Sequence, residues 1–151
     1  MNVSSDHVVK YVLWLVVLAA VGSILSCAPV RSYPEPLMTD DQIVVQIAEL
    51  TPEVPQFYTY RTRGRNVNFF VVEIDGRVLS FLDACVNCYP RKQGYQYGNG
   101  MVTCRACDTS YSVHNLEHGI GGCFPIRFEG KQENDRYIIS RAGLDRHAAK
   151  F

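Results

Sequence analysis

Short apolar runs, separated by turn-forming residues, make up most of this chain. Phe57–Thr62 and Val67–Ile74 are rich in aromatic and β-branched side chains, which is typical of β-strands. The dipeptide Asp75-Gly76 then favours a tight turn, so Arg77–Leu82 is expected to run back beside the preceding strand as a hairpin. The pattern therefore predicts a mainly β fold.

The rest of the chain carries the same pattern in shorter pieces. Asn99-Gly100 is a strong hairpin signal, and it joins two short predicted strands, Tyr95–Tyr97 and Met101–Thr103. The other predicted elements are an apolar run at Ile43–Ile47, strands near Pro125–Phe128 and Arg136–Ser140, and one or two helical turns within Ala142–Lys150. Together they predict a small β-sandwich or hairpin domain.

One long apolar segment precedes this domain. Tyr11–Leu25 carries no charge and follows Lys10. Its length is that of a signal-peptide core and is a little short for a membrane span. Residues 28–40 then hold three prolines and are expected to form an extended tether. We therefore divide the chain into an N-terminal hydrophobic helix that is a signal peptide or anchor (1–27), a tether (28–40) and a folded domain (41–151).

The sequence Ile24-Leu25-Ser26-Cys27-Ala28 resembles a bacterial lipoprotein processing site, where the cysteine is acylated and becomes the new N-terminus. Leu25 departs from that pattern, because such sites usually hold a smaller residue there. An uncleaved membrane anchor and a buried cytoplasmic helix are the alternatives. We expect an exported domain that is tethered to a membrane in the bacterial cell envelope, on the extracytoplasmic or periplasmic side.

Composition narrows the function mainly by exclusion. Of the 151 residues, 47% are hydrophobic and 20% are charged, and the formal net charge is zero. This is the composition of one globular domain, and it includes no basic stripe for nucleic acid. No Ser/His/Asp set, nucleotide-binding loop or framed pair of carboxylates is found. We therefore expect neither an enzyme active site nor a small-molecule substrate pocket, although a role as a subunit of an oxidoreductase system is compatible with this.

The most informative feature is a pair of C-x-x-C motifs, Cys85–Cys88 and Cys104–Cys107, which are fifteen residues apart in a chain with six cysteines. Such a turn directs two thiolates to one point, and two turns supply the four soft ligands that zinc or iron accepts. Each pair follows a predicted hairpin strand, so the two can converge. Cys123 follows Gly121 and Gly122, and a loop without side chains at these glycines could approach a cluster closely.

The spacing leaves three kinds of site open. Zinc and iron both accept four thiolates, so a structural zinc site and an iron site are not separated by spacing alone. Disulfides are the third kind. With Cys27 as a lipid site five cysteines remain, and an odd number does not pair completely. The N-terminal region of this chain also lacks the Arg-Arg pair that directs export of prefolded proteins. If the domain is exported, either its cluster is acquired outside the cytoplasm or the cysteines have another role, such as forming disulfides in an oxidising compartment.

Other side chains near the motifs have less specific interpretations. His114 and His118 follow the second cysteine pair, but their spacing in an irregular segment favours surface histidines over metal ligands. Tyr89, Tyr95 and Tyr97 are close enough in sequence to shield the site from water.

The order of motifs resembles the cluster-binding subdomain of Rieske proteins, in which two ligand loops are followed by a Gly/Pro loop that covers the cluster. Here that third loop would be Gly121-Gly122-Cys123-Phe124-Pro125. Rieske loops present one cysteine and one histidine each, whereas Cys88 and Cys107 stand at or near the histidine positions. Ligation by cysteine alone would lower the reduction potential, because each thiolate adds negative charge.

At family level, residues 66–144 resemble FtrD-like membrane-associated iron–sulfur proteins. The motifs that carry this resemblance are F-F-V-V-E-I-D-G, C-V-N-C, G-Y-Q-Y-G-N-G-M-V-T-C-R-A-C and G-G-C-F-P-I. The resemblance implies that Cys85, Cys88, Cys104 and Cys107 are the metal ligands, with Cys123 beside them. Some members are encoded with bacterial iron-uptake permeases, which implies that they handle electrons there.

These observations lead us to expect a membrane-tethered electron carrier with an iron–sulfur cluster of the 2Fe–2S type. Zinc is the alternative cofactor. The carrier would exchange electrons with redox proteins in or at the membrane, in iron uptake or in respiration. A structural zinc-ribbon-like binding module and a disulfide-stapled extracytoplasmic interaction domain are the alternative functions.

Overall fold

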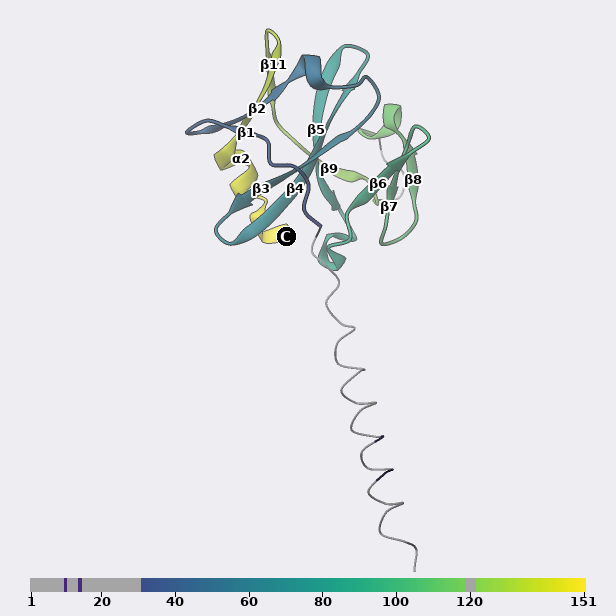
Figure 1. Ribbon diagram of the computed structural model, residues 1–151. Helices are drawn as coiled ribbons and strands as arrows, with labels where there is room; N and C mark the ends of the chain where they lie inside the picture. The colour runs from purple at the N-terminus through teal and green to yellow at the C-terminus, as the bar shows by residue number, and fades with distance from the viewer. Residues whose placement is uncertain (1–9, 11–13, 15–30, 119–121) are drawn as a thin grey trace, which may run out of the picture. The chain divides into compact units, whose positions relative to one another are not determined.

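The structure is a computed structural model that describes residues 10, 14, 31–118 and 122–151 (Figure 1). The chain divides into two compact units, Met1–Arg31 and Ser32–Phe151. Apart from Trp14, the predicted hydrophobic helix Tyr11–Leu25 lies outside the described residues, and so does the predicted lipid site, Cys27. Among the described residues, no helix has the length and apolar character that crossing a membrane requires.

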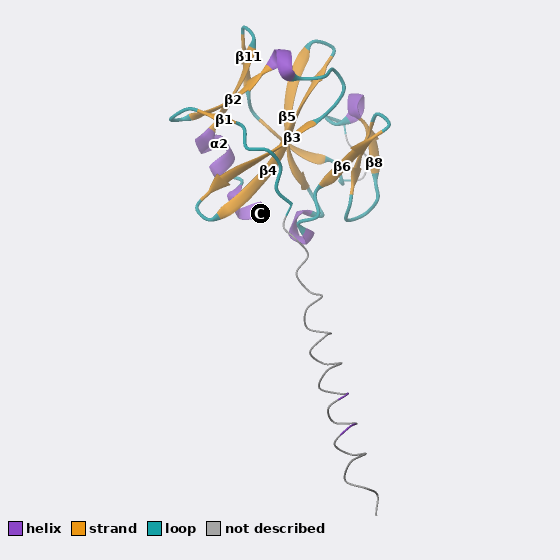
Figure 2. Ribbon diagram, in the orientation of Figure 1, coloured by secondary structure: helices purple, strands orange, loops and turns teal. Residues whose placement is uncertain are grey.

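Three antiparallel sheets build the described part of the second unit (Figure 2). The first has the order β1 (Leu37–Met38), β2 (Gln42–Gln46), β11 (Arg136–Ser140) and β10 (Lys131–Glu133). The central sheet has the order β3 (Gln56–Thr62), β4 (Arg65–Ile74), β5 (Arg77–Cys85) and β9 (Pro125–Phe128). The third sheet has the order β6 (Tyr95–Gly98), β7 (Met101–Cys104) and β8 (Ser110–Ser112).

The prediction of a mainly β fold is confirmed, and the predicted strands are found with shifts of a few residues at their ends. The terminal helical turns are α2 (Arg141–Asp145) and a 3-10 turn at Ala148–Lys150. The exposed strands β1 and β10 were not predicted, because β1 is only two residues long and lies in the expected tether, and β10 is polar throughout. Leu37 of β1 pairs with Val44 of β2, so the compact unit begins at Ser32 and includes part of the expected tether.

The central sheet is buried on both faces, which explains why β4 and β5 are nearly continuous in apolar residues. Phe69 and Leu82 lie opposite each other in register and face the first sheet and α2. Their neighbours Phe70 and Phe81 are also paired, and they face the third sheet. Successive side chains of a strand point to opposite faces, so each of these strands contributes to two separate cores.

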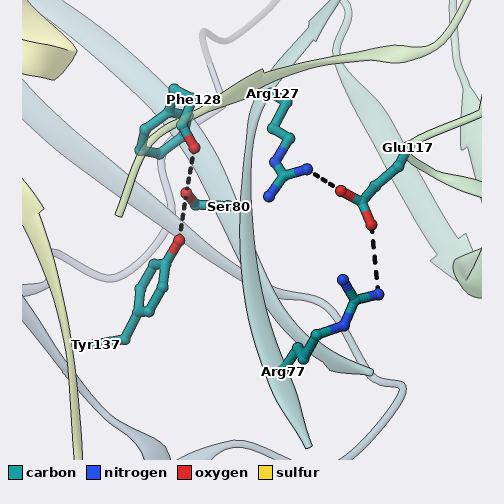
Figure 3. A network of polar contacts seen from close by, with 6 residues as sticks. All are labelled: Arg77, Ser80, Glu117, Arg127, Phe128 and Tyr137. Atoms are coloured by element: carbon teal, nitrogen blue, oxygen red, sulfur yellow. Dashed lines mark hydrogen bonds and ion pairs between the residues drawn. The ribbon is translucent and has the colours of Figure 1, made fainter. Parts of the chain in front are cut away.

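A buried hydroxyl joins the central sheet to the first sheet. Ser80 Oγ of β5 donates to the carbonyl oxygen of Phe128 in β9 at 2.8 Å, and it lies 2.9 Å from the hydroxyl of Tyr137 in β11 (Figure 3). Ser80 is completely buried and therefore needs these partners. The interaction holds three strands from distant parts of the sequence in one arrangement.

Candidate metal centre

The first cysteine of each C-x-x-C motif ends a strand and points into the core between the central sheet and the third sheet. Cys85 is the last residue of β5 and lies on the same face as Phe81. Cys104 is the last residue of β7 and lies on the same face as Val102. Their exposed fractions are only 2% and 1%. Alternation along two strands thus brings these two thiols into the same core.

The second cysteine of each motif lies in the turn that follows the strand, nearer to solvent. The backbone N–H of Cys88 donates to Cys85 Sγ at 3.4 Å, and Cys88 is half-buried. Cys107 is exposed. Arg91, just beyond the first turn, donates from Nη1 to the carbonyl oxygen of Ala106 in the second turn at 2.7 Å. The two cysteine turns are therefore tied together.

The third loop brings Cys123 to the same place. The hydroxyl of Tyr95 in β6 donates to the carbonyl oxygen of Cys123 at 2.8 Å. The N–H of Val86, in the first cysteine turn, donates to the carbonyl oxygen of Phe124 at 3.2 Å. Two residues beyond Cys123, β9 begins with Pro125, which lies opposite Cys85 in register. These contacts fix the third loop against the first cysteine turn.

The sulfur atoms of all five described cysteines gather in one cluster. Those of Cys85, Cys88 and Cys104 lie within 4.8 Å of one another, and so do those of Cys88, Cys107 and Cys123. Cys88 belongs to both groups. All five are free thiols, and the sulfur atoms of Cys107 and Cys123 are 3.4 Å apart. A site with only sulfur donors suits soft metals: zinc, copper(I) or iron in an iron–sulfur cluster.

The thiols of the cluster differ widely in pKa. Hydrogen bonding with Thr109 lowers the pKa of Cys107 to about 6. Burial and the neighbouring thiols raise the pKa of Cys88 to about 12, and burial also raises that of Cys104 to about 12. Hydrogen bonding with Cys107 raises the pKa of Cys123 to about 11. Several thiolates together in this space need positive charge, which a metal centre supplies.

Two buried tyrosines border the thiol cluster. Tyr95 is fully buried and Tyr111 is 7% exposed. Burial and the nearby cysteines raise the pKa of both hydroxyls, so both stay neutral. The predicted shielding by Tyr95 agrees with this position, whereas Tyr89 and Tyr97 are only half-buried. Tyr111 was not predicted to have this role, because it is the pairing of β8 with β7, opposite Val102, that places it there.

Asp83 supports the same region from β5, two residues before Cys85 and on the same face. It is 5% exposed and accepts hydrogen bonds from the Tyr95 N–H at 2.5 Å and from the Tyr33 hydroxyl at 3.1 Å. Gly94 has a φ of +64°, and a Cβ there would overlap with the Asp83 carboxylate. This carboxylate therefore positions the start of β6. Sequence reasoning missed it, because its partners are distant along the chain.

The two histidines that follow the second cysteine pair are surface residues, as predicted. His114 and His118 are both exposed. His114 lies 3.5 Å from Glu53, measured from Nε2 to Oε2. In the described part of the chain, the groups of side chains that could hold a metal ion consist of cysteines alone.

Glu117, in the segment between β8 and Cys123, forms two ion pairs that are called here the ion-pair bridge. Glu117 pairs with Arg127 of β9 through Oε1, and its Oε2 lies 3.6 Å from Arg77 Nη2 of β5 (Figure 3). The neighbouring Leu116 is 1% exposed. A cavity of about 460 Å³ opens beside this bridge, and Phe124 forms part of its wall. The sequence does not predict the cavity, because its walls come from distant segments.

Comparison with known proteins places the chain in a family. The family described as "Membrane iron-sulfur containing protein FtrD-like" matches residues 51–151, which include all five described cysteines. No curated protein matches.

Two of the solved structures that match cover about two thirds of this chain. The ferredoxin of carbazole 1,9a-dioxygenase from Nocardioides aromaticivorans IC177 has 14% identity and a TM-score of 0.40, over 63% of this chain and 91% of its own. A protein described as a "putative nitrite reductase NADPH (small subunit) oxidoreductase protein" has 14% identity and a TM-score of 0.35, over 67% of this chain and 97% of its own. The family match covers most of the folded unit and its whole thiol cluster, so the chain belongs to the FtrD-like family of membrane iron–sulfur proteins.

Proposed function

We propose that this protein is a membrane-tethered electron carrier of the bacterial cell envelope, built around an iron–sulfur centre of the 2Fe–2S type. The observation that carries the proposal is the gathering of five free thiols at one point between two sheets. Four thiolates are the protein ligands that such a centre needs. Cys85, Cys88, Cys104 and Cys107 would hold it, with Cys123 beside them. An iron–sulfur centre, when bound, supplies one-electron redox chemistry.

The surroundings of the thiols support electron transfer. Cys85 and Cys104 are buried, and Tyr95 and Tyr111 shield this inner side from water. Cys107 is exposed, so the same cluster of thiols also reaches the surface. A carrier needs such an exposed edge to exchange electrons with a partner, and a buried side to set its potential. The partners would be redox proteins in or at the membrane, serving iron uptake or respiration.

The N-terminal segment supports the tether part of the proposal. Tyr11–Leu25 has the apolar character of a signal peptide or anchor, and Cys27 stands where lipoproteins are acylated. Globomycin-treated cells that express the chain would accumulate an unprocessed form if Cys27 is acylated and becomes the N-terminus. If the chain has the same size with and without globomycin and remains in the membrane fraction, the segment is instead an uncleaved anchor.

The decisive experiment for the metal centre is analysis of iron, zinc and acid-labile sulfide, with an absorption spectrum, on the full chain purified without oxygen. We expect iron and sulfide in equal amounts, a coloured protein, and visible absorption that bleaches on reduction. A colourless protein with one zinc per chain would replace the proposal with a structural zinc site. A chain without metal whose thiols resist alkylation until a reductant is added would indicate disulfides.

A further inference from the structure

The thiol cluster contains one more cysteine than a site with four thiolate ligands can use. Two of the five are fixed by the strands: Cys85 and Cys104 end β5 and β7 and are almost completely buried. Cys88 belongs to both groups of neighbouring sulfur atoms, so it connects the buried half to the outer half. One ligand position remains, and two thiols compete for it.

Those two thiols are Cys107 and Cys123. Their sulfur atoms are 3.4 Å apart, which is contact distance, and both lie in the group that includes Cys88. Neither belongs to the group formed by Cys85, Cys88 and Cys104. A small displacement of either loop would therefore bring one sulfur or the other to the same place.

The position of Cys123 is built into the fold. Its carbonyl oxygen accepts from the fully buried Tyr95, and the next residue accepts from Val86. Gly122 has a φ of +77°, and a Cβ there would lie 2.7 Å from Asn87 Nδ2 in the first cysteine turn. The loop thus approaches the first turn closely, at a backbone angle that favours glycine. If Cys123 were only a small side chain that fills space, its backbone would not need to be held by both Tyr95 and the first cysteine turn.

We infer that Cys107 and Cys123 are alternative ligands for one outer position of the metal centre, while Cys85, Cys88 and Cys104 bind permanently. This inference rests on the metal site of the proposed function. In the exchange, the incoming thiol loses its proton and the departing thiolate gains one, so neither the net charge nor the redox state changes. Ligation by Cys107 leaves the outer ligand on the exposed turn, and ligation by Cys123 moves it to the half-buried third loop.

The test uses the full chain with Cys27→Ser, so that five thiols remain. Reduced, metal-free protein is titrated with Co²⁺, whose thiolate charge-transfer absorption reports the number of sulfur ligands. We expect Cys107→Ala and Cys123→Ala each to bind Co²⁺ within about tenfold of the parent affinity, with four thiolates. The double variant should lose more than about a hundredfold. Cys104→Ala is the control for a permanent ligand and should bind poorly.

A second measurement identifies the unused thiol directly. The Co²⁺-loaded parent is treated briefly with iodoacetamide, and the modified cysteine is located by mass spectrometry. We expect one modification per chain, found on Cys107 in some molecules and on Cys123 in others. Modification of Cys85, Cys88 or Cys104 would overturn the inference. Loss of Co²⁺ binding in either Cys107→Ala or Cys123→Ala, or in both, would also overturn it.

The same variants separate this inference from the proposed function. If the parent takes up Co²⁺ with the expected exchange but forms no iron–sulfur centre with ferrous iron and sulfide, the proposed function fails and the alternative ligation stands. If the iron–sulfur centre forms but one outer variant cannot hold metal, the alternative ligation fails and the function stands. Circular dichroism of each metal-free variant checks that it is folded.

Discussion

The hydroxyl of Tyr95 donates a hydrogen bond of 2.8 Å to the carbonyl oxygen of Cys123, twenty-eight residues later in the chain. Tyr95 begins β6, and its ring packs edge-on against Phe70 of the central sheet, with 6.3 Å between ring centroids. The tyrosine is therefore fixed by the core, and through its hydroxyl it fixes the loop that carries the fifth thiol.

Removing this hydroxyl should loosen the third loop. In Tyr95→Phe the carbonyl of Cys123 loses its partner, and we expect a loss of about 1–3 kcal/mol in the free energy of unfolding, measured with urea. Cys123 of the metal-free protein should also react faster with iodoacetamide. Tyr97→Phe, on the same strand but only half-buried, is the matched control and should change neither quantity. Equal behaviour of the two variants would contradict a positioning role for Tyr95.

Gly94→Ala should be strongly destabilising for two separate reasons. The φ of +64° is strained for alanine, and its Cβ would overlap with the buried Asp83 carboxylate. Gly100 provides the control, because its φ is +74° and no atom lies within 4 Å of a Cβ there. Gly100→Ala should cost only the backbone strain, about 1–2 kcal/mol. Urea unfolding should show a clearly larger loss for Gly94→Ala, and equal losses would rule out the overlap.

Substitutions of the neighbouring residues Leu116 and Glu117, which precede Cys123 in the chain, should differ sharply in their effect on the free energy of unfolding. Leu116 is 1% exposed, so Leu116→Ala should lower the free energy of unfolding by about 2–5 kcal/mol. Glu117 is itself 18% exposed and pairs with Arg77 and Arg127, whose side chains are 67% and 57% exposed, so solvent reaches the cationic end of both pairs. Because solvent screens such pairs, Glu117→Gln should cost less than about 1 kcal/mol, and high salt should reduce that cost further. A loss in Glu117→Gln as large as that in Leu116→Ala would show that the bridge is structurally essential.

His147 should make the fold sensitive to mild acid. Burial, together with Lys150 and Arg146, lowers its pKa in the folded state below the unfolded value of about 6.5. The neutral form is therefore favoured by folding, and its contribution is complete above about pH 6.5 and lost as the pH falls through the folded pKa. Thermal unfolding at pH 7.5 and 5.5 should show a smaller decrease for His147→Gln than for the wild type. An unchanged decrease would exclude His147 as its source.

Removing the metal should affect one side of the domain. The first cysteine turn follows β5 and the second follows β7, whereas buried residues of β2 and β11 belong to the opposite core. Hydrogen exchange measured by mass spectrometry should therefore show lost protection in residues 85–107 after chelation. The first sheet and α2 should keep theirs. Uniform loss of protection across the domain would mean that the metal is required for the whole fold.

Most strands were predictable from sequence because β-branched and aromatic runs alternate with turn dipeptides such as Asp75-Gly76 and Asn99-Gly100. What escaped prediction were elements whose stability comes from neighbours. β1 and β10 are short and exposed, and they exist because β2 and β11 offer them free edges. Asp83 and Tyr111 have ordinary surroundings in the sequence, and their relation to the thiols appears only when three sheets are stacked.

Two C-x-x-C turns that each follow a strand, and a fifth cysteine in a glycine-rich loop, can be read directly from the order of residues. Those are local properties, set by residue type and spacing. The folded arrangement adds that the turns converge, that Cys85 and Cys104 are buried while Cys107 is exposed, and that Cys123 contacts Cys107. These relations depend on how the central sheet is buried on both faces, which arises from packing between segments far apart in the chain.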